Sequence, residues 1–146
     1  MNGALVRILL MEDDPGDVEL IREALRDAKM ALAIDHVWNG EEGMRYLRRE
    51  GDFSQAERPD IVLLDLNMPL KDGREVLEEI KNDKGLRTIP VVVLTTSDAE
   101  PDIMNSYDLG ANCYLQKPLG LSDFLHVVKS VEDFWLTMVK LPPRDA

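Results

Sequence analysis

Short apolar runs alternate along the chain with longer stretches in which apolar residues recur at every third or fourth position. Runs of four to six apolar residues are typical of buried strands, whereas the longer spacing is typical of helices with one side on a core. Five strand–helix units fit this alternation, which predicts an α/β fold with a parallel sheet covered on both faces. The predicted strands are residues 6–11, 33–37, 61–64, 90–94 and 111–115.

The predicted helices carry apolar residues at helical spacing and residues suited to helix ends. Pro15 fits the first turn of the first helix, where a missing N–H is no loss. Ser122 is predicted to cap the last helix, and Gly110 to end the fourth in a left-handed conformation. The polar segment from Glu50 to Pro59 is predicted to be an inserted loop. The helical positions are Val18, Ile21, Leu25 and Ala28, then Met44 and Leu47, then Val76, Leu77 and Ile80, then Ile103, Met104 and Tyr107, and last Phe124, Leu125, Val128, Val131, Trp135 and Met138.

The length of 146 residues suits one domain, because a chain of this size buries roughly 70% of the surface that it exposes when unfolded. We expect residues 1–141 to form this domain and residues 142–146, which begin with two prolines, to fray. The sequence has no run of about 18 apolar residues and does not start with a basic segment leading into an apolar one. We therefore expect no membrane span and no signal peptide, and a cytoplasmic protein.

The net charge of −11 argues against direct binding to nucleic acids, which depends on lysine and arginine to neutralise phosphates. A basic partner or a divalent cation is the better expectation, although many surface carboxylates serve only solubility. The single cysteine, Cys113, has no second cysteine for a disulfide or a metal site, and we expect it inside a strand.

Asp65 stands where the third apolar run ends, and it has two interpretations. Aspartate commonly opens a loop through hydrogen bonds to its own backbone. In open α/β sheets, however, ligands and reacting groups gather at the carboxyl ends of the strands. Glu12, Asp13 and Asp14 follow the first strand and would meet the same edge. Because close carboxylates repel unless a cation lies between them, Glu12 and Asp13 predict a magnesium site, while Asp14 before Pro15 can simply cap a helix.

The fourth and fifth strands add a hydroxyl and an ammonium group to this edge. Thr95 ends the fourth strand, and Lys117, before a proline, follows the fifth. Lysine can pair with a carboxylate and with a phosphoryl oxygen. A carboxylate is a known nucleophile that forms aspartyl phosphates, and phosphoryl transfer needs positioning and positive charge. The set therefore predicts phosphoryl transfer to Asp65 with Mg²⁺.

These residues give the chain a resemblance to the receiver domain of two-component response regulators over essentially its whole length. The spacings of 30 residues from Asp65 to Thr95 and of 22 from Thr95 to Lys117 are similar to those of the family. The resemblance implies a flavodoxin-like (βα)5 doubly wound sheet with strand order 2-1-3-4-5. The matching stretches are residues 8–14, residues 64–69, Asp72-Gly73, residues 93–96 and Lys117-Pro118.

The resemblance also implies a role for each matching residue. Asp65 resembles the phosphoacceptor, Thr95 the switch hydroxyl and Lys117 the lysine of the family. Glu12 and Asp13, with Asp65, resemble the magnesium acids, and Asn67 resembles the residue whose backbone carbonyl binds the metal. Tyr114 resembles the switch aromatic, although it can also be ordinary strand packing.

Residues 12–20 and 94–97 resemble those of single-domain regulators that are partners of bacterial phytochrome histidine kinases. The implied partner is a sensor histidine kinase. No DNA-binding or catalytic domain follows in the sequence, so we expect signalling by protein contact or onward phosphotransfer, not the turnover of an enzyme.

The last helix has more apolar positions than one core-facing side needs, and we predict a homodimer through this helix and the adjacent surface. The alternative is a well-buried terminal helix with a few exposed apolar residues. The positions are Phe124, Val127, Val128, Val131, Phe134, Trp135, Met138 and Val139.

Three other functions share parts of this pattern. An FMN-binding flavodoxin has the same fold, but Glu12, Asp13 and Asp14 would repel its phosphate. A phosphatase of the haloacid dehalogenase type has a second acid two residues after its nucleophile, where this chain has Asn67. A receiver-like binding module that is never phosphorylated also fits the sequence.

Overall fold

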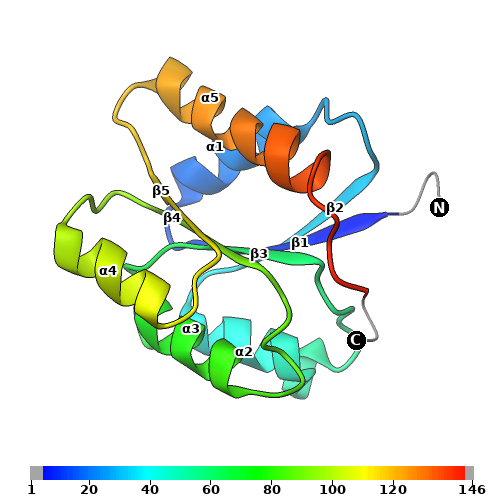
Figure 1. Cartoon of the computed structure of the whole chain (residues 1–146). Helices are drawn as coiled ribbons and strands as arrows, with labels where there is room; N and C mark the ends of the chain where they lie inside the picture. Colours follow the sequence, from blue (N-terminus) through cyan, green and yellow to red (C-terminus); the bar gives the residue numbers. More distant parts are fainter. Residues whose placement is uncertain (1–4, 144–146) are drawn as a thin grey trace.

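The computed structural model describes residues 5–143, which contain a five-stranded parallel sheet in the order β2-β1-β3-β4-β5 (Figure 1). The predicted fold class and strand order are confirmed. Two strands start later than predicted. Pro90 has no N–H to give to a neighbouring strand, and the Ala111 N–H is used by Ser106 at the end of the preceding helix. The strands are β1 (Val6–Met11), β2 (Leu32–Val37), β3 (Ile61–Leu64), β4 (Val91–Thr95) and β5 (Cys113–Gln116).

The helices follow the strands in the predicted order. Pro15 opens α1 as predicted, and Gly110 has a φ of 107° at the end of α4, a conformation that favours glycine. Three predictions of detail were wrong. The last α-helix ends at Val131, so Trp135 lies in the π-helix that follows and Met138 lies beyond it. The first helix ends at Leu25, before Ala28, and Ser122 does not cap the last helix, because Gly120 is its N-cap residue and Ser122 lies inside it. The helices are α1 (Pro15–Leu25), α2 (Gly40–Arg48), η1 (Gly51–Phe53, a 3₁₀-helix), α3 (Gly73–Asn82), α4 (Glu100–Asp108), α5 (Leu121–Val131) and η2 (Glu132–Leu136, a π-helix).

The sheet divides the hydrophobic core into two layers. Helices α1 and α5 cover one face, and α2, α3 and α4 cover the other (Figure 1). Alternate residues of β1 point to opposite faces, so Ile8 and Leu10 pack under α1 and α5, while Leu9 and Met11 pack on the opposite face. Residues 61–64 of β3 are fully buried, which explains why this strand is a continuous apolar run.

The predicted inserted loop contains η1, and the Phe53 ring lies 5.6 Å from the ring of Tyr46 on α2. At the other end of the chain, Pro142 and Pro143 line a small hollow together with Arg58 and Pro59. The rest of the predicted frayed tail, residues 144–146, lies outside the described residues. Within residues 5–143, the helices are all too short or too polar to cross a membrane.

Candidate functional site

The site lies at the carboxyl ends of β1 and β3, which are neighbours in the sheet. Met11 pairs with Leu64 in the register of these strands, so the residues that follow, Glu12 and Asp65, leave the sheet side by side. The Asp65 N–H donates to the Met11 carbonyl at 3.1 Å, which fixes the point where the Asp65 side chain emerges. Strand order and register, rather than closeness in sequence, therefore bring the predicted acids together.

Glu12, Asp13 and Asp65 each offer a carboxylate oxygen, and these oxygens lie within 4.8 Å of one another. Glu12 and Asp65 are buried and Asp13 is exposed. Burial, and then the negative charge of Asp65, raise the pKa of Glu12 to about 8, against the opposing effect of Lys117. A cation between these oxygens would relieve this repulsion. Hard oxygen ligands open to water on one side fit a divalent ion such as Mg²⁺.

Asp14 takes no part in this group. Its side chain accepts the N–H groups of Gly16, at 2.8 Å, and Asp17, at 3.2 Å, so it caps α1. The helix-cap alternative is therefore the correct one for Asp14. The Asp14 N–H in turn donates to Glu12 Oε2 at 3.2 Å, so the start of α1 also positions a carboxylate of the site.

Lys117 is buried and its ammonium group contacts three carboxylates. Its Nζ lies 2.6 Å from Glu12 Oε1, 2.8 Å from Asp17 Oδ2 and 3.0 Å from Asp65 Oδ2. Burial by itself would lower the pKa of Lys117, but the bonds to Asp17 and Glu12 and the charge of Asp65 outweigh it and raise the pKa. The peptide bond between Lys117 and Pro118 is trans. Lys117 thus remains an ammonium ion in the middle of the acids.

Two further groups contact the other oxygen of Asp65. Thr95 Oγ1, which is fully buried, donates to Asp65 Oδ1 at 2.8 Å. The backbone N–H of Asn67 reaches the same oxygen at 3.2 Å. The side chain of Asp65 is therefore held by contacts from β4, from the β5–α5 loop and from its own loop.

The loop after Asp65 turns back sharply, so the start of α3 lies against the backbone of the site. The Gly73 N–H donates to the Leu66 carbonyl at 2.8 Å, and a Cβ atom on Gly73 would lie 2.4 Å from the Asp65 carbonyl oxygen. Asp72 and Glu75 form a capping box at this helix start. Glycine is thus required here for the close approach of two backbones.

Tyr114, the predicted switch aromatic, lies on β5 and is half-buried against the core layer of α2 and α3. Its hydroxyl donates to the Ser97 carbonyl at 2.8 Å, two residues beyond Thr95. Burial raises the pKa of Tyr114, so the hydroxyl stays protonated as a donor. Both Thr95 and Tyr114 are therefore turned inward, toward the site and the β4–α4 loop.

Sequence reasoning missed Asp17, Arg74 and Asp102. Asp17 is the third partner of Lys117. Its position one helical turn after the cap residue Asp14 is the only feature of the sequence that could have indicated it. Arg74 Nη2 on α3 donates at 2.8 Å to Asp102 Oδ1 on α4, a residue 28 positions later in the sequence. This pairing depends on how α3 and α4 pack, which the sequence pattern does not fix.

Comparison with known proteins agrees with this geometry. The family described as “Response regulator receiver domain” matches residues 8–129. The chain belongs to the response regulator receiver family.

This receiver is 45% identical over 135 residues to Response regulator Rcp1 of Synechocystis sp., with 92% of each protein covered. The structure of the phosphorylated cyanobacterial phytochrome response regulator RcpA matches with a TM-score of 0.93 and 51% identity, covering 96% of the receiver and 100% of RcpA. The Mn²⁺-bound form of Rcp1 matches with a TM-score of 0.92 and 44% identity, covering 94% and 99%. The receiver is thus similar along nearly its whole length to Rcp1 and to RcpA, of which RcpA is described as a phytochrome response regulator.

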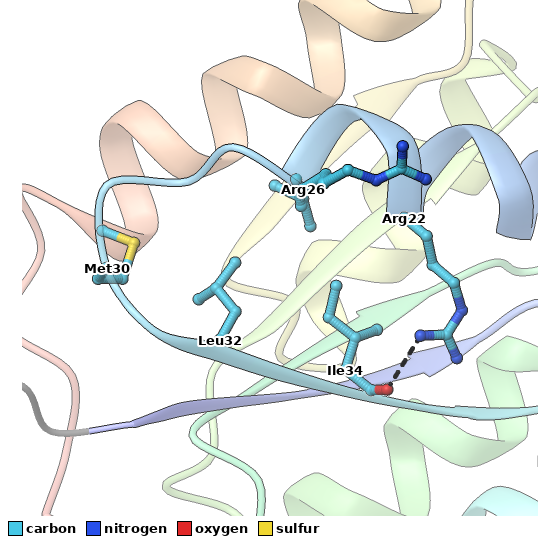
Figure 2. A pocket seen from close by; sticks show the side chains of 6 residues that line it. Arg22, Arg26, Met30, Leu32 and Ile34 are labelled. Carbon is cyan, nitrogen blue, oxygen red and sulfur yellow. Dashed lines mark hydrogen bonds between the residues drawn. The ribbon is translucent and has the colours of Figure 1, made fainter.

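A groove of about 260 Å³ lies away from the acids, between α1 and the edge strand β2 (Figure 2). The Arg22 guanidinium points to the strand and donates to the Ile34 carbonyl at 3.2 Å, whereas Arg26 points away from it (Figure 2). Arg22 therefore occupies one backbone acceptor of an edge strand, which otherwise invites pairing with another chain. The groove is lined by Arg22, Leu25, Arg26, Met30, Leu32 and Ile34.

Proposed function

We propose that Asp65 is the phosphoacceptor of this receiver, with Glu12, Asp13 and Asp65 as Mg²⁺ ligands and Thr95 and Lys117 as its assisting groups. The observation that carries the proposal is the convergence of Thr95 and Lys117 on the two oxygens of one buried carboxylate, at 2.8 and 3.0 Å. Two partners, one from β4 and one from the β5–α5 loop, fit a group whose charge changes during a reaction.

In this reaction an oxygen of Asp65 attacks the phosphorus of a phosphohistidine or of a small acyl phosphate. A P–O bond to Asp65 forms while the bond from phosphorus to the donor breaks, and the electron pair leaves with the donor. Lys117 neutralises negative charge on the phosphoryl oxygens, and the Thr95 hydroxyl can donate a hydrogen bond to one of them. No base is needed, because Asp65 reacts as a carboxylate.

Magnesium fits the site because three carboxylate oxygens converge there and because the burial of Glu12 leaves its negative charge poorly solvated. When bound, the ion screens the repulsion between the phosphoryl group and the acids. The backbone carbonyl of Asn67 is the fourth ligand that we propose. Mn²⁺ in the related Rcp1 structure is consistent with a divalent cation.

We infer that the phosphoryl donor is a sensor histidine kinase, and that a bacterial phytochrome is the kinase class to test first. The similarity to RcpA and Rcp1 supports this inference, as does a 40% identical structure titled “Bacteriophytochrome response regulator RtBRR”. We also infer that the protein is a signalling component in the cytoplasm that takes up a single phosphoryl group, not a turnover enzyme, and that it does not bind DNA directly.

We further infer a homodimer through α5 and the adjacent surface, which includes η2, the turn after it and β5. Part of the predicted apolar surface is core, because Phe124, Val128 and Val131 are buried. Phe134 and Met138 are exposed, at 54% and 72%, and Phe134 borders an apolar cavity of about 200 Å³ beside Cys113 and Leu115. Light scattering at micromolar concentration should show a dimer that Phe134→Asp converts to a monomer. A monomeric parent protein would refute the inference.

The decisive test of the phosphoacceptor is the intact mass after incubation with acetyl phosphate and Mg²⁺. The parent protein should gain one phosphoryl group, and Asp65→Asn should gain none. Omission of Mg²⁺ should suppress the adduct in the parent protein. The absence of an adduct on the parent protein would favour a receiver-like module that is not phosphorylated, and an adduct on Asp65→Asn would move the acceptor to another residue.

A further inference from the structure

Three polar residues link α3 to the start of α4, beside the proposed phosphoacceptor. Asp102, in the first turn of α4, accepts from Arg74 Nη2 of α3 at 2.8 Å with one oxygen and from Ser97 Oγ at 2.6 Å with the other. Ser97 lies in the β4–α4 loop, and its Oγ also accepts the Ala99 N–H at 3.3 Å. We call Arg74, Ser97 and Asp102 the α4 clamp.

Helix α4 has little else to hold it in place. Of its residues only Ser106 is buried, whereas α3 buries Gly73, Val76, Leu77 and Ile80. Its N-cap residue, Ala99, provides no side-chain hydrogen bond. Elements with few buried apolar contacts are the ones that open or move most easily. The polar contacts of the α4 clamp should therefore matter more for the position of α4 than such contacts would for α3.

Ser106 gives a second indication that α4 is weakly packed against the rest of the molecule. Its hydroxyl is fully buried and has no hydrogen-bond partner in residues 5–143. A buried hydroxyl without a partner is unfavourable. The other contacts of α4, the α4 clamp among them, must offset this cost.

The α4 clamp is connected to the proposed phosphoacceptor through Ser97. The Ser97 carbonyl accepts the Tyr114 hydroxyl at 2.8 Å, and Thr95, two residues earlier on the same strand end, donates to Asp65. Fixing Ser97 thus fixes the segment that carries the Thr95 hydroxyl and the acceptor for Tyr114. The side chains of Arg74 and Asp102 are 29% and 27% exposed, so the ion pair is only partly screened by water.

We propose that the α4 clamp stabilises the arrangement in which Thr95 contacts Asp65 and Tyr114 is turned inward, and that it thereby favours phosphorylation of Asp65. Arg74 and Asp102 are positioning residues in this proposal, because they act on the site only through Ser97. The part that concerns phosphorylation rests on the proposed function, whereas the part that concerns α4 does not. The coupling is a population shift between two conformations of the protein. Contacts that form in only one conformation favour any ligand or modification that also favours that conformation.

The first measurement is hydrogen exchange in the unphosphorylated protein, followed in peptides that cover residues 98–110. Arg74→Met and Asp102→Asn should each speed exchange there by about fivefold, as expected for a partly exposed charged hydrogen bond. Because the two residues act through one contact, the double variant should exchange no faster than the faster single variant. Glu100→Gln is the matched control, since it removes a negative charge from the same helical turn without touching the clamp.

The second measurement is the initial rate of phosphorylation by acetyl phosphate with Mg²⁺, read as intact mass. Arg74→Met and Asp102→Asn should lower this rate by about fivefold, and Glu100→Gln should leave it unchanged. Unchanged exchange in the two variants would refute the clamp itself. Faster exchange with an equal or higher phosphorylation rate would refute its link to the site. A parent protein that takes up no phosphoryl group would overturn the proposed function, while hydrogen exchange would still decide the clamp.

Discussion

Replacing Lys117 by methionine tests the electrostatic logic of the site most directly. Lys117 is the only cation in contact with Glu12, Asp17 and Asp65 among the described residues, and its side chain is 3% exposed. Lys117→Met keeps the length of the side chain and removes its charge. The folded protein then holds Asp17 and Asp65 without this counter-ion, beside a Glu12 whose pKa, already raised to about 8, loses the lowering effect of Lys117. The unfolded chain keeps all three groups in water.

The magnitude follows from the burial of these groups. Two unit charges about 4 Å apart interact by roughly 4 kcal/mol at an effective dielectric constant of about 20. Removing one partner of a buried ion pair costs about 3–5 kcal/mol. We therefore expect Lys117→Met to lower the free energy of unfolding by about 3–5 kcal/mol without a divalent cation. The free energy of unfolding of a domain is about 5–15 kcal/mol, so this loss is a large part of the total.

Urea unfolding at neutral pH, with and without millimolar Mg²⁺, is the assay. Magnesium should stabilise the variant more than the parent protein, because it replaces the lost positive charge; tenfold tighter binding corresponds to about 1.4 kcal/mol. Lys71→Met is the control, since Lys71 pairs with Glu79 at the surface and its loss should cost less than about 1 kcal/mol. The reasoning would be refuted if Lys117→Met were as stable as the control variant without Mg²⁺. It would also be refuted if Mg²⁺ stabilised Lys117→Met no more than the parent protein.

Two predictions concern other positions. Glu132 is fully buried, accepts the Lys29 N–H at 3.0 Å and pairs with Lys129. Burial opposes ionisation, but these contacts outweigh it and lower the pKa of Glu132. Its charge therefore stabilises the fold above the unfolded pKa of about 4.3 and loses this effect as pH falls through the lower folded pKa. Glu132→Gln should cost about 1–3 kcal/mol in urea unfolding at pH 7 and progressively less toward pH 3, and a pH-independent difference would contradict this. Gly73→Ala should cost about 1–3 kcal/mol and slow phosphorylation, because its Cβ would clash with the Asp65 backbone; wild-type stability would contradict the close approach.

Much of the fold could be predicted because the chain is locally consistent. β1 and β3 were predicted with their observed limits, since β3 and the last four residues of β1 are buried on both faces and therefore form continuous apolar runs. The residues at which helices begin and end were harder to predict. Ser122 is a good cap by residue type, but the chain enters α5 two residues earlier, with the Phe124 N–H bonded to the Gly120 carbonyl. Backbone hydrogen bonds decide such limits, and residue preference is a weaker influence.

The predicted site residues came from strand ends, and strand order alone places strand ends together. Glu12, Asp65 and Thr95 needed no knowledge of side-chain packing for this reason. Asp17 and Asp102 lie on helices, where the contact with Lys117 or Arg74 depends on the rotation and tilt of the helix. Hydrophobic periodicity gives the buried side of a helix but not the partner of a polar residue beside it, so these two were missed.

The close approach of Gly73 to the Asp65 backbone has a mechanical consequence. On this side of the site the backbones are in contact, so α3 can yield very little when the charge on Asp65 changes. On the opposite side α4 rests on one buried serine and a few polar bonds. The two sides of the site therefore differ in how easily their helices can shift. The fold therefore resists displacement less on the side of α4 than on the side of α3.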